Sequence, residues 1–222
     1  GHCVTIQGCN RVTVRDIRLT KGWGDGMSIG PSPVFKASLI MSRDVAVVGV
    51  VCTSNRRNAL SITNAIDVKV YDSEFSGTNG TKPQCGIDIE PNPDDFGTNN
   101  YCDKIHIENC VISENAKNGI LIWRRARGIT IKHCVIHNNG GSGIFTEAAT
   151  GVVLTGNTIS NSSANGVFIR LDCANWQVDS NTFHSNYTRL GIKTREPFDL
   201  TGAPPKVERD IKVAWSKTTN IH

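Results

Sequence analysis

A repeating unit of about 23–25 residues runs along most of the chain and restricts the fold more than any other feature. Each unit holds two short segments in which apolar residues alternate with polar ones. A small residue followed by another alternating segment completes the unit. These completing segments are Gly26–Ile29, Ala59–Ile62, Gly86–Ile89, Gly119–Ile122, Gly143–Thr146, Gly166–Ile169 and Gly191–Thr194.

The spacing of the apolar residues indicates three strands in every unit. A period of two is typical of a strand with one buried face, and each segment is too short to be a stable strand alone. A leucine-rich repeat has a similar length, but leucine is scarce here and no segment has a helical period. The sequence therefore predicts an all-β fold, a parallel β-helix of about seven coils, with one strand per coil in each of three parallel sheets.

Stacking of equivalent residues predicts continuous inward columns. One column holds Ile87, Ile120, Ile144, Val167 and Ile192. A second column ends in Asn157 and Asn181, whose amides would bond the backbone of the neighbouring turn as a ladder. We expect Ile211 and Val213 to begin an incomplete eighth coil.

Three insertions interrupt the repeat, at residues 30–43, 76–85 and 90–104. The first and the last follow the third strand of their coils, two coils apart, so they would form the walls of a groove on one edge of the rod. Long loops in compact domains are usually functional or disordered. We expect residues 1–222 to form a single domain that is a fragment of a longer rod.

Composition and charge exclude several classes of protein. The net charge of +4 is mild, and no Lys/Arg-rich block points to nucleic acid. No apolar run approaches the roughly 18 residues that a membrane span needs. The 8 cysteines are irregularly spaced without a CxxC pair, which favours buried reduced thiols over disulfides or a zinc site. No cofactor and no metal are predicted.

The outward residues of the third strands form a column that is unusual for a solvent-facing surface. Alternation places a serine pair, a carboxylate and then apolar residues in one column, followed by a cation. The members are Ser28, Ser61, Asp88, Leu121, Phe145, Phe168 and Lys193. Large apolar residues at these positions would contact either a ligand or a neighbouring subunit.

Asp88 and Glu90 are the predicted catalytic residues. They share one strand face about 6–7 Å apart, a separation comparable to that of the acid and base of a glycosidase. Glu90 beside Trp123 would be the general acid, and Asp88 near Arg57 would stay ionised as base or nucleophile. Asp25 and Glu147 are the next candidates. The alternative is that these carboxylates only keep the surface soluble or bind sugar hydroxyls.

The residues predicted to bind substrate surround this pair. They comprise an aromatic platform for stacking on a sugar, cations for acidic groups and one further carboxylate. These are Trp123, Arg56, Arg57, Arg124, Arg170 and Glu147.

The coils resemble the right-handed parallel β-helix repeats shared by pectate lyases, polygalacturonases and phage tailspikes. The stretch Asn55–Arg57, followed by Cys85–Asn92, is similar to a pattern in β-helix proteins of bacteriophage tails and bacterial genomes. The polygalacturonase signature is missing apart from a partial match at Gly24–Gly26, and no calcium-binding aspartate cluster of the pectate lyase type is evident. The resemblance is specific for fold and weak for function.

This resemblance implies a rod that binds a bacterial capsular or O-antigen polysaccharide. Such a rod is often an endo-acting hydrolase or lyase and often a homotrimer. It implies a place in a virion tail, with synthesis in the host cytoplasm, or alternatively a secreted bacterial protein. The competing interpretations are a glycan-binding rod without activity and a purely structural spacer.

Overall fold

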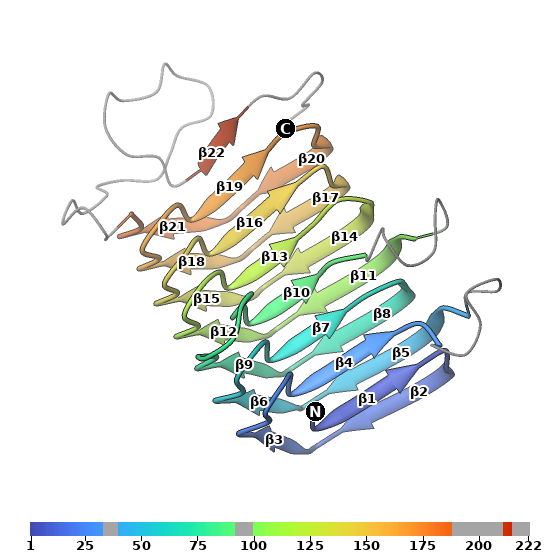
Figure 1. The fold of residues 1–222 in the computed structure, drawn as a ribbon. Coiled ribbons are helices and arrows are strands. Elements are labelled where there is room, and N and C mark those ends of the chain that lie inside the picture. The colour runs from blue at the N-terminus through green and yellow to red at the C-terminus, as the bar shows by residue number, and fades with distance from the viewer. Residues whose placement is uncertain (33–39, 92–99, 188–210, 215–222) are drawn as a thin grey trace.

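The computed structural model describes residues 1–32, 40–91 and 100–187, together with the backbone strand at 211–214. The chain winds through three sheets in turn, and every pairing joins a strand to its equivalent in the next coil in parallel orientation (Figure 1). This confirms the predicted parallel β-helix with three sheets. No helix in the described ranges is long and apolar enough to cross a membrane.

Sheet A contains the strands that complete each repeat and has eight strands in the described part of the chain. Its members are β1 (Val4–Gln7), β4 (Met27–Gly30), β7 (Leu60–Ile62), β10 (Ile87–Ile89), β13 (Ile120–Ile122), β16 (Ile144–Glu147), β19 (Val167–Arg170) and β22 (Ile211–Ala214).

Sheets B and C each have seven strands within the described residues. Sheet B comprises β2 (Asn10–Arg15), β5 (Ser42–Val48), β8 (Ala65–Tyr71), β11 (Cys102–Glu108), β14 (Ala126–Lys132), β17 (Thr150–Thr155) and β20 (Ala174–Asp179). Sheet C comprises β3 (Arg18–Thr20), β6 (Val51–Thr53), β9 (Glu74–Ser76), β12 (Val111–Ser113), β15 (Val135–His137), β18 (Thr158–Ser160) and β21 (Thr182–His184).

The inward column of sheet A is confirmed for its first four members. Ile87 pairs with Ile120, which is followed by Ile144 and Val167, and all four are fully buried. At the end of the column the strand that pairs with β19 is β22, which places Ile211 opposite Val167. Ile192, the predicted fifth member, lies outside the described residues. The predicted start of an eighth coil at Ile211 is therefore wrong.

The same pairing corrects the outward column of sheet A. Lys212 lies opposite Phe168, at the position that the repeat assigned to Lys193. Residues 191–194 lie outside the described part of the chain. Residues 191–194 and 211–214 both alternate apolar and polar side chains, so the apolar pattern alone could not tell which of them pairs with β19.

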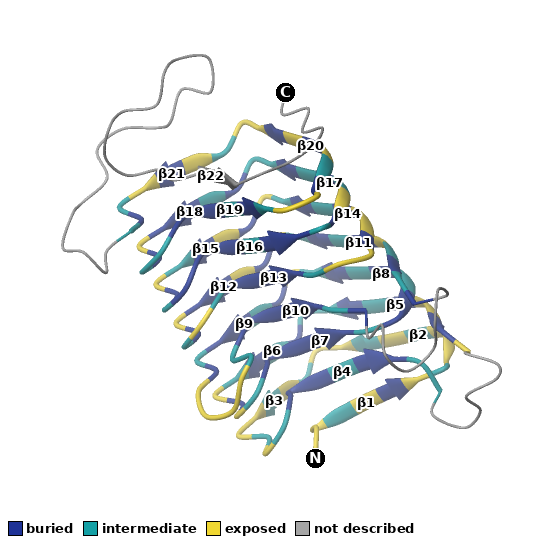
Figure 2. Cartoon of the chain, turned by 45° about the horizontal axis from the view of Figure 1, so that its top comes forward, coloured by how far each residue is buried: buried dark blue, intermediate teal, exposed yellow. Residues whose placement is uncertain are grey.

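The core is a narrow column of mainly aliphatic side chains enclosed by the three sheets. Figure 2 shows buried residues recurring along the strands from coil to coil. The predicted asparagine ladder is present at the corner between sheets B and C. Asn157 receives a hydrogen bond from the backbone N–H of Cys134, and Asn181 receives one from that of Asn157. A second ladder, not predicted, joins Asn115 to Asn139 on the other side of sheet C.

A column of left-handed residues turns the chain sharply from sheet B to sheet C. The residue after each sheet B strand has a positive φ, which Gly, Asn and Asp adopt most readily. The column comprises Asp16, Gly49, Asp72, Asn109, His133, Gly156 and Ser180. This shared conformation lets a single residue close the corner in every coil.

None of the eight cysteines, which all lie in the described part of the chain, forms a disulfide, and six of them are buried as predicted. Burial raises the pKa of the Cys52 and Cys102 thiols to about 12, so both remain protonated at neutral pH. Cys3 and Cys9 differ from the prediction because they are exposed in the first coil.

Candidate functional site

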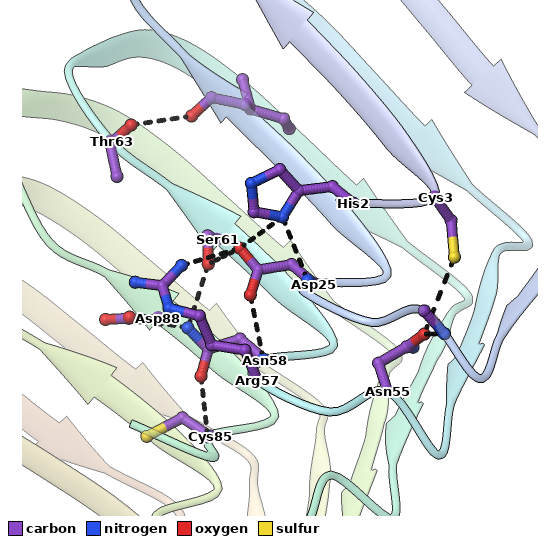
Figure 3. A network of polar contacts seen from close by, with 12 residues as sticks. His2, Cys3, Asp25, Asn55, Arg57, Asn58, Ser61, Thr63, Cys85 and Asp88 are labelled. Carbon is purple, nitrogen blue, oxygen red and sulfur yellow. Dashed lines mark hydrogen bonds and ion pairs between the residues drawn. The ribbon is translucent and has the colours of Figure 1, made fainter. Parts of the chain in front are cut away.

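A buried polar cluster lies on the outward side of sheet A, centred on Asp25 (Figure 3). Asp25 belongs to the loop between β3 and β4. Its Oδ2 atom accepts hydrogen bonds from Arg57 Nη1 and Ser61 Oγ, both at 2.9 Å. Its Oδ1 atom accepts one from the backbone N–H of Asn58 at 3.0 Å. Asp25 is therefore held by three donors, more than the simple turn residue that the sequence suggested as one alternative.

His2 closes the cluster from the first coil. The backbone N–H of Asp25 donates to His2 Nδ1 at 3.0 Å. Because a backbone N–H can only donate, Nδ1 acts as an acceptor in this arrangement. The 3.2 Å approach between Nδ1 and Asp25 Oδ2 is then a contact between two acceptors rather than an ion pair.

Asn58 connects this cluster to Asp88. Its Nδ2 atom donates to Asp88 Oδ2 at 2.8 Å and to Ser61 Oγ at 3.0 Å. Its Oδ1 atom accepts from the backbone N–H of Cys85 at 2.9 Å. Asn58 was not predicted as a site residue, because a buried asparagine in a turn has no periodic signature.

Asp88 is 1% exposed although it points outward from β10. The expectation of a solvent-facing carboxylate is therefore wrong. Its Oδ1 atom is buried and has no hydrogen-bond partner among the described residues. Burial, and after it the nearby charge of Glu90, raise the pKa of Asp88 to about 7 against the opposing positive charge of Arg57.

The burial of Asp88 reverses part of the predicted assignment of general acid and base. Asp88 was expected to stay ionised beside Arg57, but desolvation outweighs that attraction. A carboxylic acid with a pKa of about 7 is half protonated at neutral pH, and it can act there as a proton donor or acceptor.

Glu90 lines a surface pocket of about 420 Å³ at the end of β10. The other lining residues come from the insertion at 76–85 and from the turn before β13, and they are Lys82, Pro83, Cys85, Lys117 and Asn118. Cys85 and Glu90, which flank β10, both line the pocket, whereas Asp88, which lies between them in the strand, does not. The two lysines were not predicted, because single exposed lysines are common on protein surfaces.

The other half of sheet A carries an aromatic row. The Trp123 and Phe145 rings are stacked with their centroids 6.3 Å apart, and Phe168 meets Phe145 edge-on at 5.2 Å. All three rings are partly exposed, whereas Leu121 in the same outward face is buried. The structure therefore brings the predicted aromatic platform together.

Glu147 lies beside this row and is only 2% exposed. It accepts hydrogen bonds from Arg124, at 3.0 Å from Nε and 2.6 Å from Nη2, and from Arg170 Nη1 at 2.6 Å. Three of the six residues predicted to bind substrate, Arg124, Glu147 and Arg170, thus form one ion-pair cluster. Arg124 also lies over the Trp123 ring, 5.6 Å from its centroid.

The predicted pair Arg56 and Arg57 separates in space. Arg57 binds Asp25 inside the polar cluster, whereas Arg56 lies 4.2 Å over the ring of Trp23. Trp23 is 73% exposed and precedes Asp25 by two residues. Sequence reasoning missed Trp23, although an aromatic residue between two glycines at a loop was a usable signal.

The walls of the predicted groove fall mainly at residues 33–39 and 92–99, which lie outside the described residues. Among the residues that are described, no three His, Cys, Asp or Glu side chains gather into a possible metal site.

Comparison with known proteins supports the fold. The family model described as a right handed beta helix region matches residues 98–196. The A-module of the Azotobacter vinelandii mannuronan C-5 epimerase AlgE4 superposes on 96% of this chain with a TM-score of 0.63 at 14% identity. The chain is a right-handed parallel β-helix. This confirms the resemblance in fold on which the sequence analysis relied.

Two further similarities cover smaller parts. The Dettilon tailspike protein superposes on 75% of this chain with a TM-score of 0.52 at 13% identity. The uncharacterized protein YclG of Bacillus subtilis strain 168 is 33% identical over 94 residues, which is 40% of this chain. The chain spans 16% of YclG, 34% of the tailspike and 58% of the epimerase module, so it corresponds to a part of each.

Proposed function

We propose that this β-helix binds and cleaves an acidic bacterial surface polysaccharide on the outward face of sheet A. One observation carries the proposal. Asp88, with a pKa of about 7, interacts with Glu90, and Glu90 lines a pocket together with two lysines. A protonatable carboxyl beside a second carboxylate is the combination that acid–base cleavage of a glycosidic bond requires.

The names of the structural neighbours support a polysaccharide as ligand. One neighbour is an epimerase of mannuronan and another is a phage tailspike. Their low identity to this chain means that they support the fold directly and the ligand class only by analogy. The cationic pocket adds an argument from this chain itself, because Lys82 and Lys117 would attract an acidic sugar.

In the hydrolytic form of the proposal, protonated Asp88 gives its proton to the glycosidic oxygen as the bond to the anomeric carbon breaks. Glu90 acts as the base that activates water, or as the nucleophile that attacks the anomeric carbon. In the lyase form, a base removes the proton next to the sugar carboxylate, and the glycosidic bond breaks with formation of a double bond. The lyase product absorbs in the ultraviolet, which separates the two forms.

A second candidate is glycan binding without cleavage. The burial of Asp88 favours it, because a side chain that is 1% exposed cannot touch a substrate unless its surroundings move. The partly exposed row of Trp123, Phe145 and Phe168 would then be the main sugar contact.

As further parts of the proposal, the chain forms homotrimers in a phage virion tail, or else belongs to a secreted bacterial protein.

The test is incubation of the protein with a panel of bacterial capsular and O-antigen polysaccharides, followed by sizing of the products. We expect Asp88→Asn and Glu90→Gln each to lower turnover about 100-fold or more. Circular dichroism should show an unchanged fold. The exposed Glu114 provides a matched control, because Glu114→Gln should keep full activity.

Two results would overturn the catalytic proposal. One is full activity in both single variants, and the other is binding of a glycan by the wild-type protein without any shortening of the chain. The second result would establish the binding rod instead. Sedimentation analysis at micromolar concentration tests the trimer separately from the chemistry.

A further inference from the structure

At the corner between sheets B and C, one side chain per coil occupies the position of the asparagine ladder. Ser73, Asn157 and Asn181 each accept a hydrogen bond there from a backbone N–H of the preceding coil, at 3.0, 2.9 and 2.9 Å. Two successive coils in the middle of the stack carry Cys110 and Cys134 at this position instead. A thiol is a weak acceptor, so hydrogen bonding between coils does not by itself explain why cysteine occupies both positions.

Cys110 and Cys134 lie directly opposite each other in neighbouring coils. The strands on both sides of them are paired in register, β11 with β14 before the corner and β12 with β15 after it. The backbone N–H of Val135 donates to the carbonyl of Cys110 at 2.9 Å. Paired strands are about 4.8 Å apart, which falls within the Cα separation of about 4.4–6.8 Å that a disulfide spans. A bond between the two sulfurs therefore requires no change of register.

The two thiols also interact with each other. Their side chains are within hydrogen-bonding reach, and this contact lowers the pKa of Cys134 and raises the pKa of Cys110. Burial opposes the lowering at Cys134, and a hydrogen bond from the backbone of Cys110 supports it. The thiolate is the reactive form of cysteine. The pair thus places a sulfur that can react with an oxidant beside a second thiol that can attack the oxidised product.

Both sulfurs lie just beneath the surface of the corner. Each cysteine is 1% exposed, but the residue on either side of it in the sequence is exposed in both coils. These neighbours are Asn109, Val111, His133 and Val135. A bulky reagent cannot enter such a site, whereas hydrogen peroxide is scarcely larger than water. Peroxide is therefore the class of oxidant that fits the site.

We propose that Cys110 and Cys134 form a site of reversible oxidation, at which peroxide converts the thiol pair into a disulfide. In the first step the O–O bond breaks, the Cys134 sulfur becomes a sulfenic acid, and one water molecule leaves. In the second step the Cys110 sulfur attacks the Cys134 sulfur, the S–O bond breaks, and a second water molecule leaves. The two thiols supply the two electrons that reduce the peroxide. The disulfide joins two coils covalently, and the inference does not depend on the proposed function.

The experiment treats the full chain with hydrogen peroxide and maps the cysteines by mass spectrometry. Cys3→Ser and Cys9→Ser are introduced first, because these two exposed thiols would otherwise react. We expect the intact mass to fall by two hydrogen atoms, a proteolytic peptide pair to be linked through Cys110 and Cys134, and dithiothreitol to reverse both changes. Cys102 is the internal control and should stay reduced, because it lies opposite Ala126 and burial raises its pKa to about 12.

Two single variants sharpen the test. Cys110→Ser and Cys134→Ser should each fold, as circular dichroism would show, because serine already occupies the equivalent position at Ser73. Each should abolish the loss of hydrogen, and Cys110→Ser should leave a sulfenic acid at Cys134 that dimedone labels.

Three results would overturn the inference. One is the lack of a link between Cys110 and Cys134 in the peroxide-treated protein. Another is a gain of oxygen atoms at these cysteines in place of the loss of hydrogen, which would mean that the pair cannot close. The third is oxidation of Cys102 at the same rate, which would mean that peroxide attacks the buried thiols without selection.

Discussion

The outward face of sheet A differs between the two halves of the rod. From β4 to β10 it carries Ser28, Ser61 and Asp88, of which the last two belong to a buried polar network, whereas from β13 to β19 it carries apolar and aromatic residues. The backbone register is the same throughout. The comparison shows that the scaffold keeps the positions fixed, and that the side chains alone decide whether a stretch is suited to proton transfer or to stacking.

The largest effect should come from a substitution in the inward column of sheet A, which both halves share. Replacing Ile144 with Asp places an unpaired charge in a fully buried stack without water, and we expect no folded protein. Circular dichroism and the yield of soluble protein would show this. Thr182→Asp, at an exposed position of β21, should fold normally. A folded Ile144→Asp variant would mean that the inward column is wrongly assigned.

The next largest effect should distinguish two buried carboxylates, Asp25 in the polar half and Glu147 in the aromatic half. Asp25→Ala leaves Ser61, Arg57 and a backbone N–H without their acceptor, and should lower the free energy of unfolding by about 3 kcal/mol or more. Glu147→Ala should cost less, about 1–2 kcal/mol, because the side chains of Arg124 and Arg170 are 60% and 43% exposed and can be hydrated. Urea unfolding of both variants measures the difference. Equal losses would contradict the contrast between the halves.

A third prediction concerns pH and Asp88. Its pKa rises from 3.8 to about 7 on folding, so the native state binds the proton more tightly than the unfolded chain. The stability associated with this proton is fully present below pH 3.8 and is lost as the pH rises through about 7. Asp88→Asn removes this dependence.

The free energy of unfolding of Asp88→Asn relative to wild type should therefore increase between pH 4 and pH 8, by a few kcal/mol at most, and the melting temperature should rise with it. Thermal unfolding across this range is the measurement. A difference that stays constant with pH would mean that Asp88 titrates in the folded protein as it does in the unfolded chain.

The smallest effect is expected in the aromatic row. Phe145→Leu removes the ring that contacts both Trp123 and Phe168 but keeps most of the apolar area. We expect a loss of about 1–2 kcal/mol, since an aromatic pair contributes about 0.5–1.5 kcal/mol beyond its buried area. Urea unfolding measures this, and glycan affinity of the same variant shows whether stacking also serves binding. No change in either quantity would leave the row without a role.

The fold could be predicted from the sequence because alternation and repeat length are properties of single residues in order. Burial of Ile87, Ile120 and Ile144 follows from that pattern directly. The burial of Asp88 does not follow, because alternation places a residue on the outer side of a strand and cannot tell what covers that side. The network of Asp25, Asn58 and Asp88 joins residues about 30 apart or more through loops without a period.

The asparagine ladders have a consequence for how the rod comes apart. Asn157 bonds to the backbone of the coil before it, through Ile131 and Cys134, and to Asn181 of the coil after it. Opening a coil in the middle of the stack would strip partners from two neighbours at once, whereas opening one at an end strips them from only one. Unfolding should therefore begin at an end of the stack and proceed coil by coil, because the asparagine ladders couple each coil to both of its neighbours.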